Sequence, residues 1–354
     1  MNRLRRLLSA ACLAAAACLA VAATAQPSDP RAAPTRQITD AAGRVVTLPA
    51  TVNRVADAWH ANNSTVLMLG GASKLVATTV QARKQPWLQR LYPRIESLPA
   101  AFNAAGEVNV ETLIGARPDV ILMAYDGSLP KWFDTISPYP IAVVLMPNTS
   151  LEDLATTARL TGQVLGERES RVAADYVRYF EGNIHRVRQI TDRLAPSERP
   201  KVLHTSSAGI LTADGLDTLI DDWIHVAGGV NAAQVKGNGR PVSLEQIIAW
   251  NPDVIIVGSA PNQQSRAAIL ADPRWSGIKA VRTGKVYANP SGAYLWDRHG
   301  AESALQVLWA AKLLHPQDFA DLDVRRETKL FYSRFFHYTL TDAELRSIMN
   351  ATAP

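Results

Sequence analysis

The chain has 354 residues, a formal net charge of +5 and only two cysteines. This length is enough for two domains of ordinary size. The basic residues form no dense run after residue 25, which argues against a nucleic-acid partner. Both cysteines lie within the first 20 residues, so the rest of the chain has no disulfide, thiolate metal site, iron–sulfur cluster or cysteine nucleophile.

Residues 1–25 are predicted to be a secretory signal peptide. Three arginines precede an apolar run at residues 7–22, and Ala23-Thr24-Ala25 matches a signal cleavage site. The run is Ala-rich and short of a full span, which argues against a membrane anchor. Lipidation at Cys18 is disfavoured because Ala15 stands where a lipoprotein signal usually has a bulky aliphatic residue. Cleavage after Ala25 removes the three arginines and lowers the formal charge from +5 to about +2.

The exported part of the chain begins with alternating strand-like and helix-like segments. Residues 26–36, with three prolines, are predicted to be a disordered leader. Residues 38–48 are typical of a β-hairpin around Gly43. Further strands are predicted at residues 54–58, 74–79, 120–123 and 141–145, and helices at residues 64–69 and 110–116. Such alternation indicates a parallel sheet with helices on its faces.

A long helix is predicted in the middle of the chain. Residues 167–194 contain no Gly or Pro except Gly182 and place apolar side chains at helical spacing. Such a helix would be about 42 Å long. We therefore predict that residues 166–195 connect an N-terminal lobe, residues 37–165, to a C-terminal lobe, residues 196–354. In the second lobe we expect strands at residues 201–204 and 284–287, and helices at residues 216–227, 302–314 and 341–349.

Two stretches of the chain repeat each other. Residues 108–122 and 242–256 share the pattern V-x-[VL]-E-x-[LI]-I-x-x-x-P-D-V-I-[LI]. The repeats are about 134 residues apart, which is too wide for a solenoid and suits two similar lobes. One supersecondary unit is therefore used twice.

The order of these motifs resembles that of class III periplasmic binding proteins of ABC importers, which take up ferric siderophores, haem, cobalamin and related metal chelates. The resemblance spans residues 38–345. It is carried by I-T-D-x-x-G-R with L-P and R-V, by L-G-G, by the two repeats and by residues 275–287. Residues 289–298 are most similar to the branch that binds catecholate siderophores and, in some members, nickel complexes. The family implies an α/β fold of two Rossmann-like lobes with parallel sheets, joined by a single long rigid α-helix, with the ligand cleft between them.

The loops at the carboxyl ends of the strands are predicted to line that cleft, because α/β sheets bind ligands there. The candidate ligand-binding residues are Trp59, His60, Asn62, Arg83, Phe102, Asn103 and Tyr125 in the first lobe, and His204, Arg240, Tyr294, Trp296, Arg298 and His299 in the second. The arginines would pair with the oxygens of an anionic ferric chelate. The aromatic rings would stack on the chelator, or alternatively form the edge of the core.

Three of these residues are also candidate metal ligands. His60, His204 and His299 all fall on predicted cleft loops, and His60 and His204 are expected at equivalent places in the two lobes. Imidazole suits nickel, cobalt, iron and zinc. No H-x-H or H-x₃-H spacing indicates a self-contained site, and a loop histidine more often serves as a hydrogen-bonding residue.

Glu111 and Glu245 occupy the same position in the two repeats. The family resemblance implies that they dock to arginines of a dimeric membrane permease, one glutamate from each lobe. Charge pairing of that kind fixes register and accelerates association. Alternatively, each glutamate is simply favoured near a helix N-terminus by the helix dipole.

The resemblance implies a monomeric, non-catalytic periplasmic receptor without an intrinsic cofactor, which carries an Fe(III)-siderophore to an ABC permease dimer in the inner membrane. The alternatives are a nickel or cobalt complex, haem or cobalamin, and, in another class, an exported hydrolase or chelatase. No G-x-S-x-G, H-E-x-x-H or P-loop motif is present, so no catalytic residue is predicted. Asp126, Asp214 and Asp297 could each pair with a histidine, although such pairs also arise by chance.

Overall fold

The computed structural model describes residues 34–103, 107–205, 211–258 and 262–354, and Thr35–Pro354 form one compact unit. The predicted signal peptide and most of the predicted leader lie outside the described residues. The first strand begins at Thr35, so two residues assigned to the leader belong to the hairpin. Within the described ranges, no helix is both long and apolar enough to cross a membrane.

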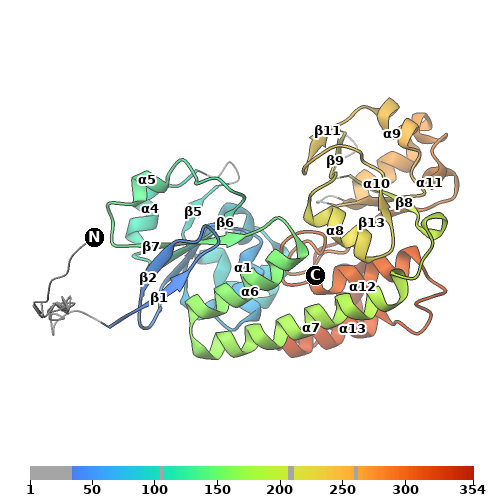
Figure 1. The fold of residues 1–354 in the computed structure, drawn as a ribbon. Coiled ribbons are helices and arrows are strands. Elements are labelled where there is room, and N and C mark those ends of the chain that lie inside the picture. Colours follow the sequence, from blue (N-terminus) through green and yellow to red (C-terminus); the bar gives the residue numbers. More distant parts are fainter. Residues whose placement is uncertain (1–33, 104–106, 206–210, 259–261) are drawn as a thin grey trace, which may run out of the picture. The chain divides into compact units, whose positions relative to one another are not determined.

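The N-terminal lobe contains a hairpin and a five-stranded parallel sheet (Figure 1). The hairpin pairs β1 with β2 in antiparallel register around Gly43, whose φ is 75°. The sheet order is β5-β4-β3-β6-β7. Strands β4 and β5 are added on one side of β3 and strands β6 and β7 on the other, so the strand order reverses between β3 and β6. The strands are β1 (Thr35–Thr39), β2 (Val45–Pro49), β3 (Val55–Asp57), β4 (Leu75–Thr79), β5 (Ala100–Phe102), β6 (Val120–Tyr125) and β7 (Ala142–Pro147).

The C-terminal lobe contains a six-stranded mixed sheet. Its order is β11-β9-β8-β12-β13, with β10 pairing β8. Strands β8, β10, β12 and β13 are parallel, whereas β9 and β11 are antiparallel additions at one edge. The strands are β8 (Lys201–Thr205), β9 (Thr212–Ala213), β10 (Val230–Asn231), β11 (Arg240–Pro241), β12 (Val254–Val257) and β13 (Val286–Ala288).

Helices cover the sheets and link the lobes. The α-helices are α1 (Asn62–Met68), α2 (Val80–Arg83), α3 (Pro86–Leu91), α4 (Val110–Gly115), α5 (Phe133–Ile136), α6 (Leu151–Leu165), α7 (Glu167–Thr191), α8 (Leu219–Val226), α9 (Leu244–Trp250), α10 (Asn262–Ala271), α11 (Lys279–Arg282), α12 (Ser303–Leu314), α13 (Val324–Phe335) and α14 (Asp342–Met349). Short 3₁₀ turns occur at Ala72–Lys74, Pro93–Ser97, Pro196–Glu198 and Pro273–Trp275.

The long helix α7 has one continuous buried face. It spans 25 residues and ends three residues before the predicted boundary. Its Tyr176 hydroxyl donates to the carbonyl of Ala301 at 2.8 Å, and its Asn183 amide donates to the carbonyl of Ala304 at 2.9 Å. Rings of α13 pack on the same face, with Phe331 and Phe335 both against Tyr176. Helix α7 therefore lies along α12 and α13 (Figure 1).

The two repeats perform the same structural task in each lobe. The Asp119 carboxylate accepts hydrogen bonds from the backbone N–H groups of Asn53 at 2.8 Å and Arg54 at 2.9 Å, which precede β3. The Asp253 carboxylate accepts one from the N–H of Lys201 at 2.8 Å, at the start of β8. Each P-D-V-I unit therefore holds the first strand of its lobe's main sheet, β3 or β8, against the strand that follows the repeat helix.

This register shows which residues of the two lobes are equivalent. Asp57 lies opposite Leu122, and His204 lies opposite Ile256. Because Leu122 and Ile256 are the same position of the repeat, Asp57 is the counterpart of His204. The prediction that His60 and His204 are equivalent is therefore wrong.

The predicted fold class is confirmed. Two α/β lobes built on the same repeat are joined by the single long helix α7. The second sheet is mixed rather than purely parallel, because the segment after β8 returns as the edge strands β9 and β11.

Candidate functional site

Side chains from the two lobes meet beyond the carboxyl ends of the sheets. Trp59 and His60 follow β3, which borders the point where the strand order reverses, the usual ligand position in α/β sheets. From the other lobe, Tyr294 and His299 lie on the segment after β13. The ring centroids of Trp59 and His299 are 5.6 Å apart, as are those of His60 and Tyr294. We refer to these four residues as the interlobe site.

Both histidines of the interlobe site are held neutral. Burial lowers the pKa of His299 to about 4, with a further lowering from the Arg298 charge. Burial also lowers the pKa of His60. The Nε2 atom of His299 is buried and has no hydrogen-bond partner among the described residues, while the ring also faces the backbone of Asn148. The site therefore presents imidazole, phenol and indole groups without formal charge.

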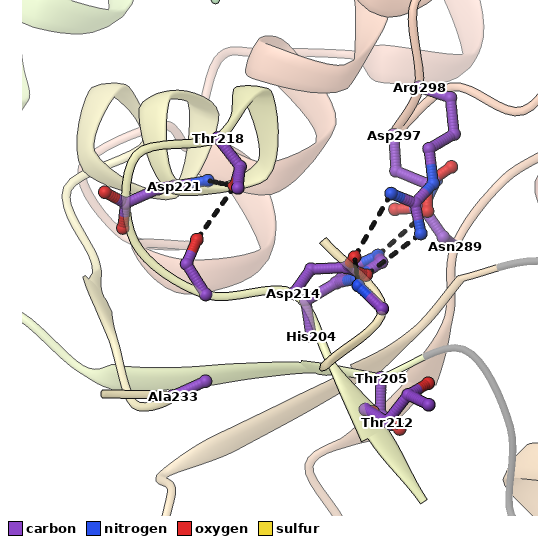
Figure 2. A network of polar contacts seen from close by, with 12 residues as sticks. His204, Thr205, Thr212, Asp214, Thr218, Asp221, Ala233, Asn289, Asp297 and Arg298 are labelled. Atoms are coloured by element: carbon purple, nitrogen blue, oxygen red, sulfur yellow. Dashed lines mark hydrogen bonds and ion pairs between the residues drawn. The ribbon is translucent and has the colours of Figure 1, made fainter. Parts of the chain in front are cut away.

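A buried cluster of four charged residues supports the second lobe's part of the site (Figure 2). His204 donates through Nδ1 to Asp214 at 2.7 Å and through Nε2 to Asp297 at 2.8 Å. Nη2 of Arg298 lies 2.9 Å from the same Asp214 oxygen. We call these four residues the charged cluster.

Members of the charged cluster shift one another's pKa values. Burial opposes protonation of His204, but the two carboxylates outweigh it and raise its pKa. Burial likewise raises the pKa of Asp214, yet His204 and Arg298 outweigh that effect and bring it well below its usual value. Two basic side chains, His204 and Arg298, therefore face two acidic ones, Asp214 and Asp297.

Backbone groups pack closely around the charged cluster. The N–H of Gly239 donates to Asp214 at 2.8 Å. A Cβ atom on Gly258 would lie 2.1 Å from the Asp297 carboxylate, so only glycine fits there. The cluster thus locks the β8 end, the loop after β9 and the segment after β13 together.

In the first lobe, Asp57 occupies the position equivalent to that of His204 in the second. Its buried carboxylate accepts hydrogen bonds from the N–H of Trp59 and the amide of Asn62, both at 3.1 Å. The Asn62 carbonyl oxygen in turn accepts from the Thr161 hydroxyl at 3.3 Å. Asn62 is therefore directed into the lobe, in contrast to its predicted place on the cleft, and it fixes the turn that carries Trp59 and His60.

Two predicted cleft aromatics belong to the core instead. Trp296 is fully buried, and its Nε1–H donates to Glu302 at 3.2 Å. Phe102 is buried against Trp132, with ring centroids 5.8 Å apart. Tyr125, at the end of β6, is partly exposed, and its place on the cleft stays a prediction.

The three predicted arginines differ in their surroundings. Arg83 donates to the backbone carbonyl of Glu96 at 3.0 Å, and Arg240 is exposed on the edge strand β11. Arg298 uses both Nη atoms on Asp214. Asn103 is exposed and bonds to Glu107 at 2.8 Å.

The structure also narrows the set of metal ligands. Both ring nitrogens of His204 are bonded to carboxylates, so the prediction of His204 as a ligand is not supported. Within the described ranges, no group of three or more histidine or carboxylate side chains is arranged to hold a metal ion. His60 and His299 remain the histidines at the interlobe site.

The two repeat glutamates are both exposed. Glu111 lies in the first turn of α4, capped by Asn109, and Glu245 lies in the first turn of α9, capped by Ser243. A hydrogen bond to the backbone and one to Ser243 lower the pKa of Glu245.

Known proteins share this architecture over nearly their whole length. The sequence profile of the periplasmic binding protein family matches residues 60–293. The molybdate-binding protein MolA of Haemophilus influenzae is 29% identical over 331 residues, covering 85% of this chain and 91% of the relative. Its molybdate-bound crystal structure superposes with a TM-score of 0.77 at 25% identity, over 86% of this chain and 99% of that one.

A periplasmic solute-binding protein from Veillonella parvula superposes with a TM-score of 0.79 at 28% identity, covering 90% of this chain and 98% of the other. The family match spans more than half of the chain and agrees with the two-lobed fold. Substrate-binding proteins of this kind serve ABC transporters and are not enzymes. The chain therefore belongs to the periplasmic binding protein family.

Proposed function

We propose that this protein binds a tetrahedral oxyanion of the molybdate class at the interlobe site. The observation that carries the proposal is the convergence of Trp59 and His60 with Tyr294 and His299 across the two lobes. The similarity to the molybdate-binding protein of Haemophilus influenzae, over most of both chains, supports this ligand class.

The chemistry of the site suits such an anion. Tyr294 donates through its hydroxyl, and burial raises its pKa, so the phenol keeps its proton. Trp59 and the two neutral histidines supply further N–H groups, with tautomers free to adjust. Hydrogen bonds from neutral donors in a buried site are strong when the acceptor is charged. The charged cluster contains Arg298, the residue next to His299, and ties the segment of Tyr294 and His299 to the end of β8.

The sequence-based expectation of a ferric siderophore has less support. It relied on Arg83, Arg240 and Arg298 as partners of an anionic chelate. Arg298 is paired with Asp214, and the other two lie on separate elements with their own environments. A catecholate complex would therefore meet few free guanidinium groups at the interlobe site.

A metal complex is the second candidate ligand, because of one feature of His299. Its Nε2 is buried and without a partner among the described residues, while the ring is oriented by the backbone at Asn148. A neutral imidazole oriented through one nitrogen is the usual state of a metal ligand. His60 is near enough for its charge to act on His299, and we propose that a nickel complex would be held by one or both imidazoles.

Calorimetric titration of the metal-free protein tests these ligand classes. Sodium molybdate is compared with sulfate, nickel–histidine and a ferric catecholate. We expect saturable binding of molybdate, weakened about tenfold or more by His299→Gln, because a hydrogen bond to a charged ligand is lost. His225→Gln, an exposed histidine on α8, is the matched control and should bind normally. A response to nickel–histidine alone would replace the oxyanion with the metal complex.

We further propose that the protein works in the periplasm and delivers its ligand to an ABC permease dimer through Glu111 and Glu245. Both glutamates are exposed in the first turns of equivalent helices, α4 and α9. One carboxylate on each lobe suits a partner with two basic pockets.

A further inference from the structure

Glu302 is a buried carboxylate outside the interlobe site. It immediately precedes α12 and is fully buried. Its oxygens accept hydrogen bonds from the N–H of Ala293 at 3.1 Å, the N–H of Tyr294 at 2.7 Å and Nε1 of Trp296 at 3.2 Å. The hydroxyl of Tyr332, on α13, also donates to it.

The carboxyl group of Glu302 is satisfied by dipoles rather than by a cation, and burial raises its pKa to about 7 although those dipoles lower it. Among the described residues, no lysine or arginine forms an ion pair with it, and each of its partners is an N–H or O–H group. Burial of an ionised group without a counter-ion carries a large desolvation penalty. A serine or threonine would cap the helix without that penalty, so capping α12 does not account for a carboxylate here.

Most of the donors come from the segment that carries half of the interlobe site. Residues 293–296 wrap around the carboxylate, and the chain then runs on to His299. Glycines mark the close approaches at both ends. A Cβ atom on Gly292 would lie 2.1 Å from Glu302 Oε1, and one on Gly300 would lie 2.9 Å from Tyr294 Cβ. A side chain at either glycine would therefore displace the segment or its neighbours.

We propose that Glu302 is a positioning residue, whose carboxylate holds residues 292–299 in the conformation that presents Tyr294 and His299 to the ligand. This inference rests on the proposed function, because it assumes that the interlobe site binds the ligand. Glu302 acts through the backbone of the segment and does not itself touch the ligand.

The main test is Glu302→Gln, which keeps the side-chain shape but replaces one acceptor oxygen with an NH₂ group. That group would face donors such as the N–H of Tyr294, so the segment should shift. We expect the affinity for molybdate to fall about tenfold with the circular dichroism spectrum unchanged. Trp296→Phe removes a single donor and is the milder variant, for which we expect a smaller loss of affinity.

Tyr332→Phe is the matched control. It removes a donor to the same carboxylate from the α13 side. The N–H of Ala293, which also donates to the Tyr332 hydroxyl at 3.2 Å, keeps its bond to Glu302, and the Tyr294 and Trp296 donors stay in place. We expect it to lower the unfolding temperature and to leave molybdate affinity within about twofold. A purely structural role for Glu302 would instead make affinity follow stability in all three variants.

Fluorine NMR of protein labelled with 5-fluorotryptophan adds a direct readout. The Trp296 resonance, assigned through Trp296→Phe, should be displaced in Glu302→Gln. Wild-type affinity in both Glu302→Gln and Trp296→Phe would overturn the inference alone. If the wild-type protein binds none of the probes, the proposed function fails, whereas a displaced Trp296 resonance would still support the positioning of the segment.

Discussion

At the scale of single residues, one buried position in β3 and its counterpart in β8 make hydrogen bonds to the segments beyond these strands. Asp57 and His204 are equivalent in register and both fully buried. A buried polar group must find hydrogen-bond partners. Asp57 finds them in the turn after β3, and His204 finds them in Asp214 and Asp297. The two lobes therefore meet the same requirement with different residues, an aspartate in one and a histidine in the other.

Removing His204 should destabilise the protein strongly. His204→Gln leaves the Asp214 and Asp297 carboxylates buried with one cation fewer, which costs about 3–5 kcal/mol in comparable buried pairs. The free energy of unfolding in guanidinium chloride measures the loss. His225→Gln is the surface control and should stay within about 0.5 kcal/mol of the parent. Equal stabilities of the two variants would contradict the role of the charged cluster.

The same variant gives a signed prediction for pH. The two carboxylates raise the pKa of His204 above its unfolded value of about 6.5, so its contribution is complete below that pH and is lost as the pH rises through the folded-state pKa. The difference in unfolding free energy between wild type and His204→Gln should therefore be largest near about pH 5.5 and shrink at higher pH. A difference that grows with rising pH would mean that His204 is neutral.

Only some residues of the interlobe site and its surroundings were placed correctly from the sequence. Trp59, His60, Tyr294 and His299 were predicted on cleft loops, and the structure brings them together. Trp296, one position in the same segment, is buried because the segment wraps around Glu302, and side-chain direction in an irregular segment follows no periodicity. The burial of His204 could have been inferred by aligning the first strands through the repeats.

At the scale of elements, helices α6 and α7 each contain a glycine, and the space around the two glycines differs. Gly166, with a φ of 142°, lies between the two helices and ends α6. Gly162, in α6, lies where α7 comes closest: a Cβ atom there would be 2.8 Å from the Cβ of Ala173. Gly182, in the middle of α7, is exposed and has open space around it.

These surroundings predict opposite effects of the same substitution. Gly182→Ala should stabilise the protein by about 0.5–1 kcal/mol, because alanine is the better helix former and meets no obstacle. Gly162→Ala should destabilise it by about 1–3 kcal/mol, because the added methyl group overpacks the contact between α6 and α7. Thermal unfolding of both variants decides the matter, and a gain in stability for Gly162→Ala would refute the close packing.

Helices α7 and α13 show which elements can be predicted from sequence. Helix α7 was predicted because its length provides several turns of apolar spacing. Helix α13 was not predicted. Phe331 and Phe335 of this 12-residue helix pack on Tyr176 and Tyr179 of α7, as well as on each other. Short helices owe most of their stability to such tertiary packing, which no local pattern reveals.

At the scale of the whole molecule, the lobes are tied by more than α7. The Trp87 indole of the first lobe donates to the carbonyl of Thr352 at 3.1 Å, and Arg90 pairs with Glu344 of α14 at 3.0 Å. Gln85 donates to the carbonyl of Gly292 at 3.0 Å. A rigid helix and a C-terminal segment that returns to the first lobe both restrict hinge motion, so ligand capture should involve a small closure.

A receptor that moves little must be recognised by its permease through surfaces on both lobes at once. Glu111 and Glu245 meet that requirement, since each is exposed at the start of the repeat helix of its own lobe. We expect the double variant Glu111→Ala/Glu245→Ala to keep its ligand affinity and to lose most transport in cells or in vesicles that contain the cognate permease. Each single variant should lose less, because one lobe would still dock.

The charge-matched control for this experiment is Glu167→Ala/Glu181→Ala. It removes two exposed glutamates from α7 that form only surface ion pairs, with Arg171 and Arg159. Surface pairs of this kind contribute little to stability, so the control should bind and transport normally. If both double variants transport equally well, the glutamates only favour the starts of their helices, and docking must use another part of the two lobes.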